Sequence, residues 1–516
     1  VRQIRGTWIT RKVLITCNRG SARNLKSKSK VTYQLAAEEM LQPNFIKKNI
    51  DKKMVKLRRV NPLTLITANR FDVMAKLLYL DFFHNNVSDN FGRSMYLAHI
   101  KLINGYVEKG SANNAIKVGA DDFISSFNSV HKSIKVNFKP TYAIPLAANK
   151  SISDGAHRLA SALYWKKWVF TFLAKGKEYQ FDYAFFVKNN FPEIYLDLMA
   201  LKYADLKMDS RLIILWPTAD RKKHREVEGI LESHGQIAYK KIFYIKPSKA
   251  WRLVKEVYKH EKWLGSHQNG FIGAKNKALW CFENDQPVVA YLYDSEVNLI
   301  KLKDKVRRLF GMGKNTIHIT DKHEETMMLS KLVFNKNSMH WLNHYREKNC
   351  SWFNVLFKEY QENLRQYKKN IDFFCIDGSS VMSIYGLRDV RDIDFIHLLQ
   401  KNVDLKVPGI EDHNEDALSH GIPINSIIID PRFHFYYEGM KSVSLEQLKK
   451  YKQSRSERKD KSDLSIIESL ILNKEKTILA LFWENFSKHS IKNLIFLLAL
   501  KMRFVWYKFV VQKYKK

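Results

Sequence analysis

The sequence has few cysteines, a shortage of acidic residues and no long apolar run. Its 516 residues include Cys17, Cys281, Cys350 and Cys375, and no two of them form a C-x-x-C pair. This spacing excludes a zinc ribbon, and scattered thiols in so long a chain are typical of a reducing cytoplasm. No stretch of 18 residues is both apolar and uncharged, and the first residues lack the apolar core of a signal peptide. We therefore expect a cytoplasmic protein without a transmembrane helix.

Basic residues greatly outnumber acidic ones. The chain holds 87 Lys and Arg against 52 Asp and Glu, a formal net charge of +35. Such a charge predicts an anionic partner: nucleic acid, anionic lipid or a phosphorylated substrate. Hydrophobic residues make up 45% and charged residues 27% of the chain, which is typical of globular proteins and excludes a mainly disordered or fibrous one.

Helical and strand patterns alternate along the chain, which predicts a multidomain, mixed α/β and α+β fold. Residues 1–60 contain sixteen Lys or Arg and three acids. Residues 491–516 contain seven basic residues, no acid and interleaved aromatic residues, so we expect an amphipathic helix there. It would lie at the inner face of a membrane with anionic lipids, or pack on its own domain. The expected parts are a basic arm (1–60), a phosphate-binding domain (61–205), an α/β domain of unknown role (206–345), a helical connector (346–370), a catalytic domain (371–490) and the C-terminal helix (491–516).

The first motif follows a short apolar strand predicted at Tyr142–Leu146. The sequence Asp154-Gly155-Ala156-His157-Arg158 opens a predicted helix. Gly155 permits a tight turn, the free N–H groups of a helix start attract anions, and Arg158 can grip a phosphate with its fork of donors. His157 could donate to phosphate or move a proton. The alternative is a structural turn in which Arg158 forms an ion pair.

This segment resembles the phosphate-binding box of the ParB/sulfiredoxin superfamily, over roughly residues 117–185. The resemblance implies a nucleotide or phosphate pocket formed by Asp154, Gly155, His157 and Arg158. The catalytic cysteine of sulfiredoxins is absent, because no cysteine lies between residues 18 and 280. A sulfinic acid reductase is therefore excluded, while a small-molecule kinase or nucleotide hydrolase remains open.

The second motif is a Gly-Ser turn followed by a pair of carboxylates. Gly378-Ser379 ends a predicted strand and opens a helix, and Asp392 and Asp394 come on the next strand. Side chains two residues apart on a strand point to the same face, and a divalent cation would relieve the repulsion between the two carboxylates. The alternative is a surface strand on which these acids pair with Arg388 and Arg391.

This arrangement is similar to the signature of the nucleotidyltransferase superfamily, over residues 371 to about 472. The resemblance implies that Gly378 and Ser379 hold a triphosphate, and that Asp392 and Asp394 hold Mg²⁺ or Mn²⁺. The family adds a third carboxylate on a later strand, and the candidate is Asp430, which follows the strand predicted at Ile424–Ile429. Arg388 could also bind phosphate, or it could neutralise the site. Lys459 belongs to a K-x-x-R…K-D-x-x-D pattern, Lys452–Asp463, that also follows the core of some minimal nucleotidyltransferases.

The middle block, 206–345, contains a further cluster at Thr316–Thr326. His318, Asp321, Glu324 and neighbouring residues could bind a metal. The interpretation we favour is a helix cap, with Asp321 as N-cap and Glu324 at the third position.

These patterns favour an enzyme that transfers phosphorus-containing groups. We expect a Mg²⁺- or Mn²⁺-dependent nucleotidyl- or phosphotransferase that takes a nucleoside triphosphate as donor and a phosphorylated or glycan acceptor. The composition and the basic C-terminus suit bacterial surface-polysaccharide biosynthesis. The alternatives are chemistry in the ParB-like domain, as a kinase or nucleotide hydrolase, and a non-enzymatic protein that binds nucleic acid.

Overall fold

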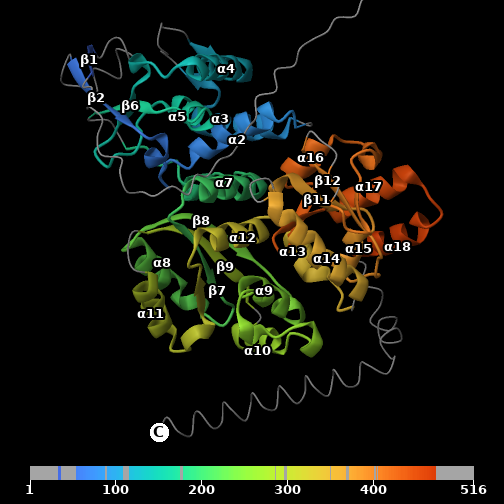
Figure 1. The fold of residues 1–516 in the computed structure, drawn as a ribbon. Coiled ribbons are helices and arrows are strands. Elements are labelled where there is room, and N and C mark those ends of the chain that lie inside the picture. The colour runs from blue at the N-terminus through green and yellow to red at the C-terminus, as the bar shows by residue number, and fades with distance from the viewer. Residues whose placement is uncertain are drawn as a thin grey trace, which may run out of the picture. The chain divides into compact units, whose positions relative to one another are not determined.

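The fold is a mixed α/β and α+β arrangement with several sheets (Figure 1). The computed structural model describes residues 33–36 and 54–471, apart from 88–89, 109–115, 175–177, 285, 296–298, 349, 368–370, 400–402 and 404. The amphipathic helix predicted at 491–516 lies outside these residues. The chain divides into two compact units, Val1–Leu448 and Lys449–Lys516. Within the described ranges, no helix combines the length and the apolar character needed to cross a membrane.

The first sheet has the strand order β1-β2-β6-β5, and only β5 and β6 run parallel. In β2, Val55 and Leu57 are buried while Lys56 and Arg58 are exposed. This alternation is that of a strand, so the last residues of the predicted basic arm belong to the first sheet. The strands are β1 (Tyr33–Ala36), β2 (Met54–Val60), β5 (Ile144–Leu146) and β6 (Val169–Leu173), with a separate pair β3 (Val107–Glu108) and β4 (Lys117–Val118). The helices are α2 (Asp72–His84), α3 (Phe91–Asn104), α4 (Ala120–Val136), α5 (Ala156–Tyr164), α6 (Tyr183–Lys188) and α7 (Glu193–Leu206).

The second sheet is antiparallel, with the order β10-β7-β9-β8. Helices α8 and α11 lie on one side of it and α12 on the other (Figure 1). Ile213 and Leu215 of β7 belong to the core under α8 and α11, whereas Leu212 and Ile214 are buried on the opposite face. Burial on both faces explains why this strand is a continuous apolar run. The elements are β7 (Ser210–Leu215), α8 (His224–Glu232), β8 (Gln236–Phe243), α9 (Ala250–Val257), α10 (Ile272–Cys281), β9 (Val288–Asp294), α11 (Leu299–Phe310), β10 (Ile317–Ile319) and α12 (His323–Val333).

The predicted cap of α12 is wrong in its residues. The N-cap position is Lys322, and the side chain that reaches back is Glu325 rather than Glu324. Glu325 Oε2 accepts from the backbone N–H of Asp321 at 2.8 Å, and its Oε1 lies 3.1 Å from His318 Nε2. His318 and Glu325 therefore join strand and helix.

The third sheet has the order β13-β12-β11-β15-β14 and mixed strand directions. The strand predicted at Ile424–Ile429 is wrong, because these residues form helix α16. Ser426, Ile427 and Ile428 are buried in succession, which a strand exposed on one face would not allow. The elements are α13 (Lys336–His344), α14 (Ser351–Leu364), β11 (Phe374–Asp377), α15 (Ser380–Ile384), β12 (Ile393–His397), β13 (Ile410–Asp412), α16 (Ile424–Ile429), β14 (His434–Tyr437) and β15 (Met440–Val443).

The second unit contains most of α17 (Leu445–Arg455) and all of α18 (Asp460–Ile471). The fully buried ammonium group of Lys452 lies 2.9 Å from a carboxylate oxygen of Asp460 and 2.8 Å from one of Asp463. Arg455 pairs with Asp460 at 2.8 Å. The K-x-x-R…K-D-x-x-D pattern is therefore an ion-pair network that joins two helices.

Candidate metal and phosphate site

The Gly-Ser turn connects β11 to α15 in the order that the sequence predicted. Gly378 has a φ of +61°, and a Cβ at this position would overlap Asp394 Oδ2. Only glycine therefore lets the Asp394 carboxylate lie against the turn. Ser379 Oγ accepts a hydrogen bond from Arg388 Nη2 at 2.8 Å. Arg388 thus lies at the turn where the sequence predicted a phosphate.

The two predicted metal ligands lie at the start of β12. Asp392 is exposed and immediately precedes the strand, while the side chain of Asp394 is 13% exposed. Ser380 Oγ donates to the backbone carbonyl of Asp392 at 3.1 Å, which ties the helix to the strand. Burial raises the pKa of Asp394 to about 6, and the charges of Asp392, Asp377 and Glu411 act in the same direction against the opposing effect of His413. This crowding of carboxylates is the repulsion that a cation would relieve.

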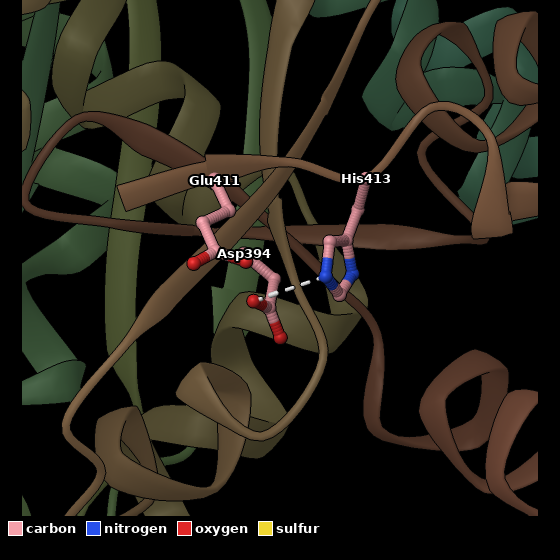
Figure 2. A group of neighbouring side chains, drawn as sticks. All are labelled: Asp394, Glu411 and His413. Atoms are coloured by element: carbon pink, nitrogen blue, oxygen red, sulfur yellow. Dashed lines mark ion pairs between the residues drawn. The ribbon is translucent and has the colours of Figure 1, made fainter. Parts of the chain in front are cut away.

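Glu411 and His413 complete the cluster, and sequence reasoning missed both. Strand β13 pairs in parallel with β12 and places Glu411 beside Asp394. One ligand atom from each of Asp394, Glu411 and His413 lies within 4.8 Å of the other two (Figure 2). Asp394 Oδ1 is 3.2 Å from His413 Nε2. The available signal was the run Glu411–Asp416, EDHNED, in which acids crowd around a histidine.

These three side chains fit a divalent cation. Two ligands that bind one ion at about 2.1 Å and at right angles are about 3 Å apart, close to the observed separation of Asp394 and His413. Carboxylates suit Mg²⁺ and Mn²⁺, whereas imidazole prefers transition metals. The ligand set therefore fits Mn²⁺ better than Mg²⁺. The other ring nitrogen of His413, Nδ1, is buried and has no hydrogen-bond partner among the described residues.

A buried Asp–His pair lies behind the turn. Asp377, the last residue of β11 and the register partner of Asp394, is completely buried. Its Oδ2 lies 2.8 Å from His420 Nε2, and Gln447 Nε2 donates to the His420 carbonyl at 2.7 Å. Burial acts to raise the pKa of Asp377, but His420 and the N–H of Gly378 hold it below its usual value. Asp377 therefore carries negative charge directly behind the cluster.

Among the described residues, Asp430 is not a member of the cluster of Asp394, Glu411 and His413. It follows α16 rather than a strand, and its fully buried carboxylate pairs with Arg432 at 2.6 Å. The guanidinium group of Arg432 lies 4.0 Å from the ring centroid of Phe91. Among the described residues, the group that could hold a metal contains Glu411 instead. Lys459 belongs to the second unit, where it pairs with Glu457 at 3.1 Å.

The box Asp154–Arg158 adopts the turn that the sequence predicted. Gly155 has a φ of +85° and α5 begins directly after it. Arg158 donates to the carbonyls of Tyr142 (3.2 Å) and Ala143 (2.9 Å) and to Asp154 Oδ2 (2.9 Å). These hydrogen bonds agree with the alternative to a phosphate site, a structural turn in which Arg158 forms an ion pair. The same donors are then not available to a phosphate unless the turn rearranges.

His157 contacts Tyr96 and Phe127. Its Nε2 is 2.9 Å from the hydroxyl of Tyr96, and its ring centroid is 4.6 Å from that of Phe127. Burial lowers the pKa of His157 well below its usual value, so the ring is neutral at pH 7.

Comparison with known proteins found no matching family model, no matching curated protein and no matching solved structure. The two resemblances drawn from short motifs therefore rest on those motifs alone.

Proposed function

We propose that this protein is a divalent-metal-dependent transferase of phosphorus-containing groups, with its active site at the Gly378-Ser379 turn and the Asp394–Glu411–His413 cluster. One observation carries the proposal. Three side chains of the kinds that bind metals lie close together, and one of them, Asp394, lies against a turn at which only glycine fits. A strand, a Gly-Ser turn, a helix and a D-x-D strand follow one another there, as in nucleotidyltransferases.

In this proposal each residue has a defined task. Asp394, Glu411 and His413, with Asp392 at the exposed edge, would hold Mn²⁺ or Mg²⁺. When bound, the ion would supply charge neutralisation for the phosphates and the attacking hydroxyl. The N–H of Gly378 donates to Asp377, and the other N–H groups of the turn together with the guanidinium group of Arg388 would bind the phosphates of a nucleoside triphosphate.

The contacts at Arg158 support a choice between the two expected phosphate sites. Its hydrogen bonds to Tyr142, Ala143 and Asp154 hold a turn together, whereas the Asp394 cluster gathers carboxylates that repel one another. We therefore place the chemistry at the third sheet rather than in the ParB-like segment.

Labelled nucleotides test this assignment. The full chain is incubated with Mn²⁺ and each nucleoside triphosphate, labelled on the α- or the γ-phosphate, with water or a sugar as acceptor. We expect slow metal-dependent release of pyrophosphate, or of the γ-phosphate, that is lost in Asp392→Asn/Asp394→Asn. Glu415→Gln, a change of an exposed acid in the same segment, is the matched control and should keep the activity. Equal release by the wild type and the double variant would contradict the proposal.

A further inference from the structure

A large cleft lies apart from the carboxylate cluster, at the other end of the third sheet. Its volume is about 1710 Å³, and its walls come from α9, α10, α11, β10 and α12 together with the β14–β15 turn. Register pairs Cys375 with Lys441, which puts Met440, at the cleft, beside the start of β11. Asp377, next to the metal cluster, is at the opposite end of that strand. The cleft is therefore a separate site.

One end of the cleft carries two neighbouring carboxylates. Glu438, in the β14–β15 turn, pairs with Lys255 of α9. Glu256 is 3% exposed, and its Oε1 is buried and lacks a hydrogen-bond partner within the part of the chain that the structure describes. A buried carboxylate oxygen without a hydrogen-bond donor destabilises the folded protein. A hydroxyl or amino group of a ligand could donate the missing hydrogen bond to Glu256 Oε1. Burial and the charge of Glu438 raise the pKa of Glu256.

The other end gathers positive charge. Lys277 Nζ donates to the carbonyl of Lys314 at 2.8 Å, and burial together with the charges of Arg307 and Lys314 lowers the pKa of Lys277. Arg307 Nε is buried and has no partner among the described residues. Lys277, Arg307 and Lys314 all line the cleft, and a bound phosphate would relieve the effect of the other two charges on Lys277.

Aromatic rings also line the cleft, close to Lys277. The Tyr258 ring centroid is 5.3 Å from that of Trp263 and 5.0 Å from that of His318, and Lys277 Nζ lies 5.8 Å from the Tyr258 centroid. Trp263 is 44% exposed. Such rings stack on the apolar faces of sugars and bases.

The overall balance of charge argues against a polyanion. The cleft wall contains eight Lys or Arg and six Asp or Glu. A nucleic acid would meet the carboxylates as well as the cations, whereas a ligand with separate hydroxyl and phosphate ends would match both.

We propose that this cleft binds a sugar phosphate, with the phosphate at Lys277, Arg307 and Lys314 and the sugar hydroxyls at Glu256 and Glu438. The volume exceeds that of most small-ligand pockets, about 300–1,000 Å³, and would accept a nucleotide-linked sugar. The inference does not depend on the proposed transferase activity, because it uses none of the same residues.

Calorimetric titration of the full chain in EDTA tests it. The probes are a hexose 1-phosphate, a nucleoside monophosphate, a nucleoside diphosphate hexose, inorganic phosphate and the free hexose. We expect at least one of the three sugar phosphates to bind about tenfold or more tightly than inorganic phosphate and free hexose. The probe with the highest affinity among these three shows whether the cleft prefers a free sugar phosphate or a nucleotide.

Variants locate the binding. Lys314→Ala should weaken the best probe about tenfold, and Glu256→Gln should weaken it without changing the affinity for inorganic phosphate. Lys305→Ala, an exposed lysine of α11 outside the cleft wall, is the control and should change nothing. Asp392→Asn/Asp394→Asn should also bind normally. No binding of any sugar phosphate, or binding lost only in Asp392→Asn/Asp394→Asn, would overturn the proposal.

Discussion

Asp394 Oδ1 and His413 Nε2 lie 3.2 Å apart, although the two residues are separated by strand β13 and the loop before it. A cation bound between the two side chains would replace this contact with two bonds to the ion. We predict that His413→Gln weakens Mn²⁺ binding about tenfold to a hundredfold, because the imidazole ligand is lost. Electron paramagnetic resonance of free Mn²⁺ measures the affinity, with Glu415→Gln as control. Unchanged affinity in His413→Gln would remove this histidine from the ligand set.

Gly378 should tolerate no side chain. Gly378→Ala adds both the cost of a positive φ and an overlap with the Asp394 carboxylate, so we expect a local loss of stability of about 3 kcal/mol. Gly105 has a φ of +63°, and a Cβ added there would have no atom within 4 Å, so Gly105→Ala should lose only about 1 kcal/mol. Amide hydrogen exchange measures both losses, in β11 for Gly378→Ala and in α3 for Gly105→Ala. Equal losses would mean that the turn does not hold the carboxylate.

Arg158 should matter for stability rather than for phosphate binding. Arg158→Ala removes three charge-assisted hydrogen bonds at the start of α5, and we expect a loss of about 2 kcal/mol in the exchange protection of that helix. Arg93→Ala, which breaks an exposed pair with Asp121, should cost less than about 1 kcal/mol. If Arg158→Ala instead keeps its stability and loses nucleotide binding, the phosphate role is the correct one.

The buried pairs of Lys452 should hold α17 and α18 together. Lys452→Met removes the buried cation that Asp460 and Asp463 share, and Arg455 still pairs with Asp460, so we expect a loss of protection in both helices equivalent to about 3 kcal/mol. Lys459→Met, at an exposed pair in the same segment, is the control and should have little effect. Equal protection in the two variants would show that the network is not structural.

The same network predicts a pH dependence. Burial acts to raise the pKa of Asp460, but Arg455 and Lys452 lower it to about 2. A carboxyl whose pKa is depressed in the folded state stabilises that state above its unfolded pKa and loses this contribution as pH falls through the folded one. Exchange protection of α18, corrected for the intrinsic rate, should therefore fall between about pH 4 and pH 2. In Asp460→Asn this fall should be much smaller, and an identical profile would contradict the assignment.

The local patterns predicted much of the fold. The turn at Gly378 and the strand that carries Asp394 were found because glycine and period-two alternation are properties of neighbouring residues. Glu411 and His413 were missed because β13 reaches Asp394 through parallel pairing, which neighbouring residues do not reveal. At Ile424–Ile429, the local pattern itself gave the wrong prediction, a strand instead of a helix. Its β-branched residues favour a strand, but packing on the third sheet favours a helix, and packing outweighs propensity.

The measurement that tests the central claim most directly is thermal stabilisation by ATP, CTP, GTP and UTP, each with Mn²⁺, with Mg²⁺ and with EDTA. It compares the wild type, Asp392→Asn/Asp394→Asn and Glu415→Gln. We predict that at least one nucleotide raises the melting temperature only when metal is present, and that the double variant alone loses this shift. A metal-dependent shift of the same size in the double variant, or no shift with any nucleotide and metal, would contradict a metal and phosphate site at Asp394.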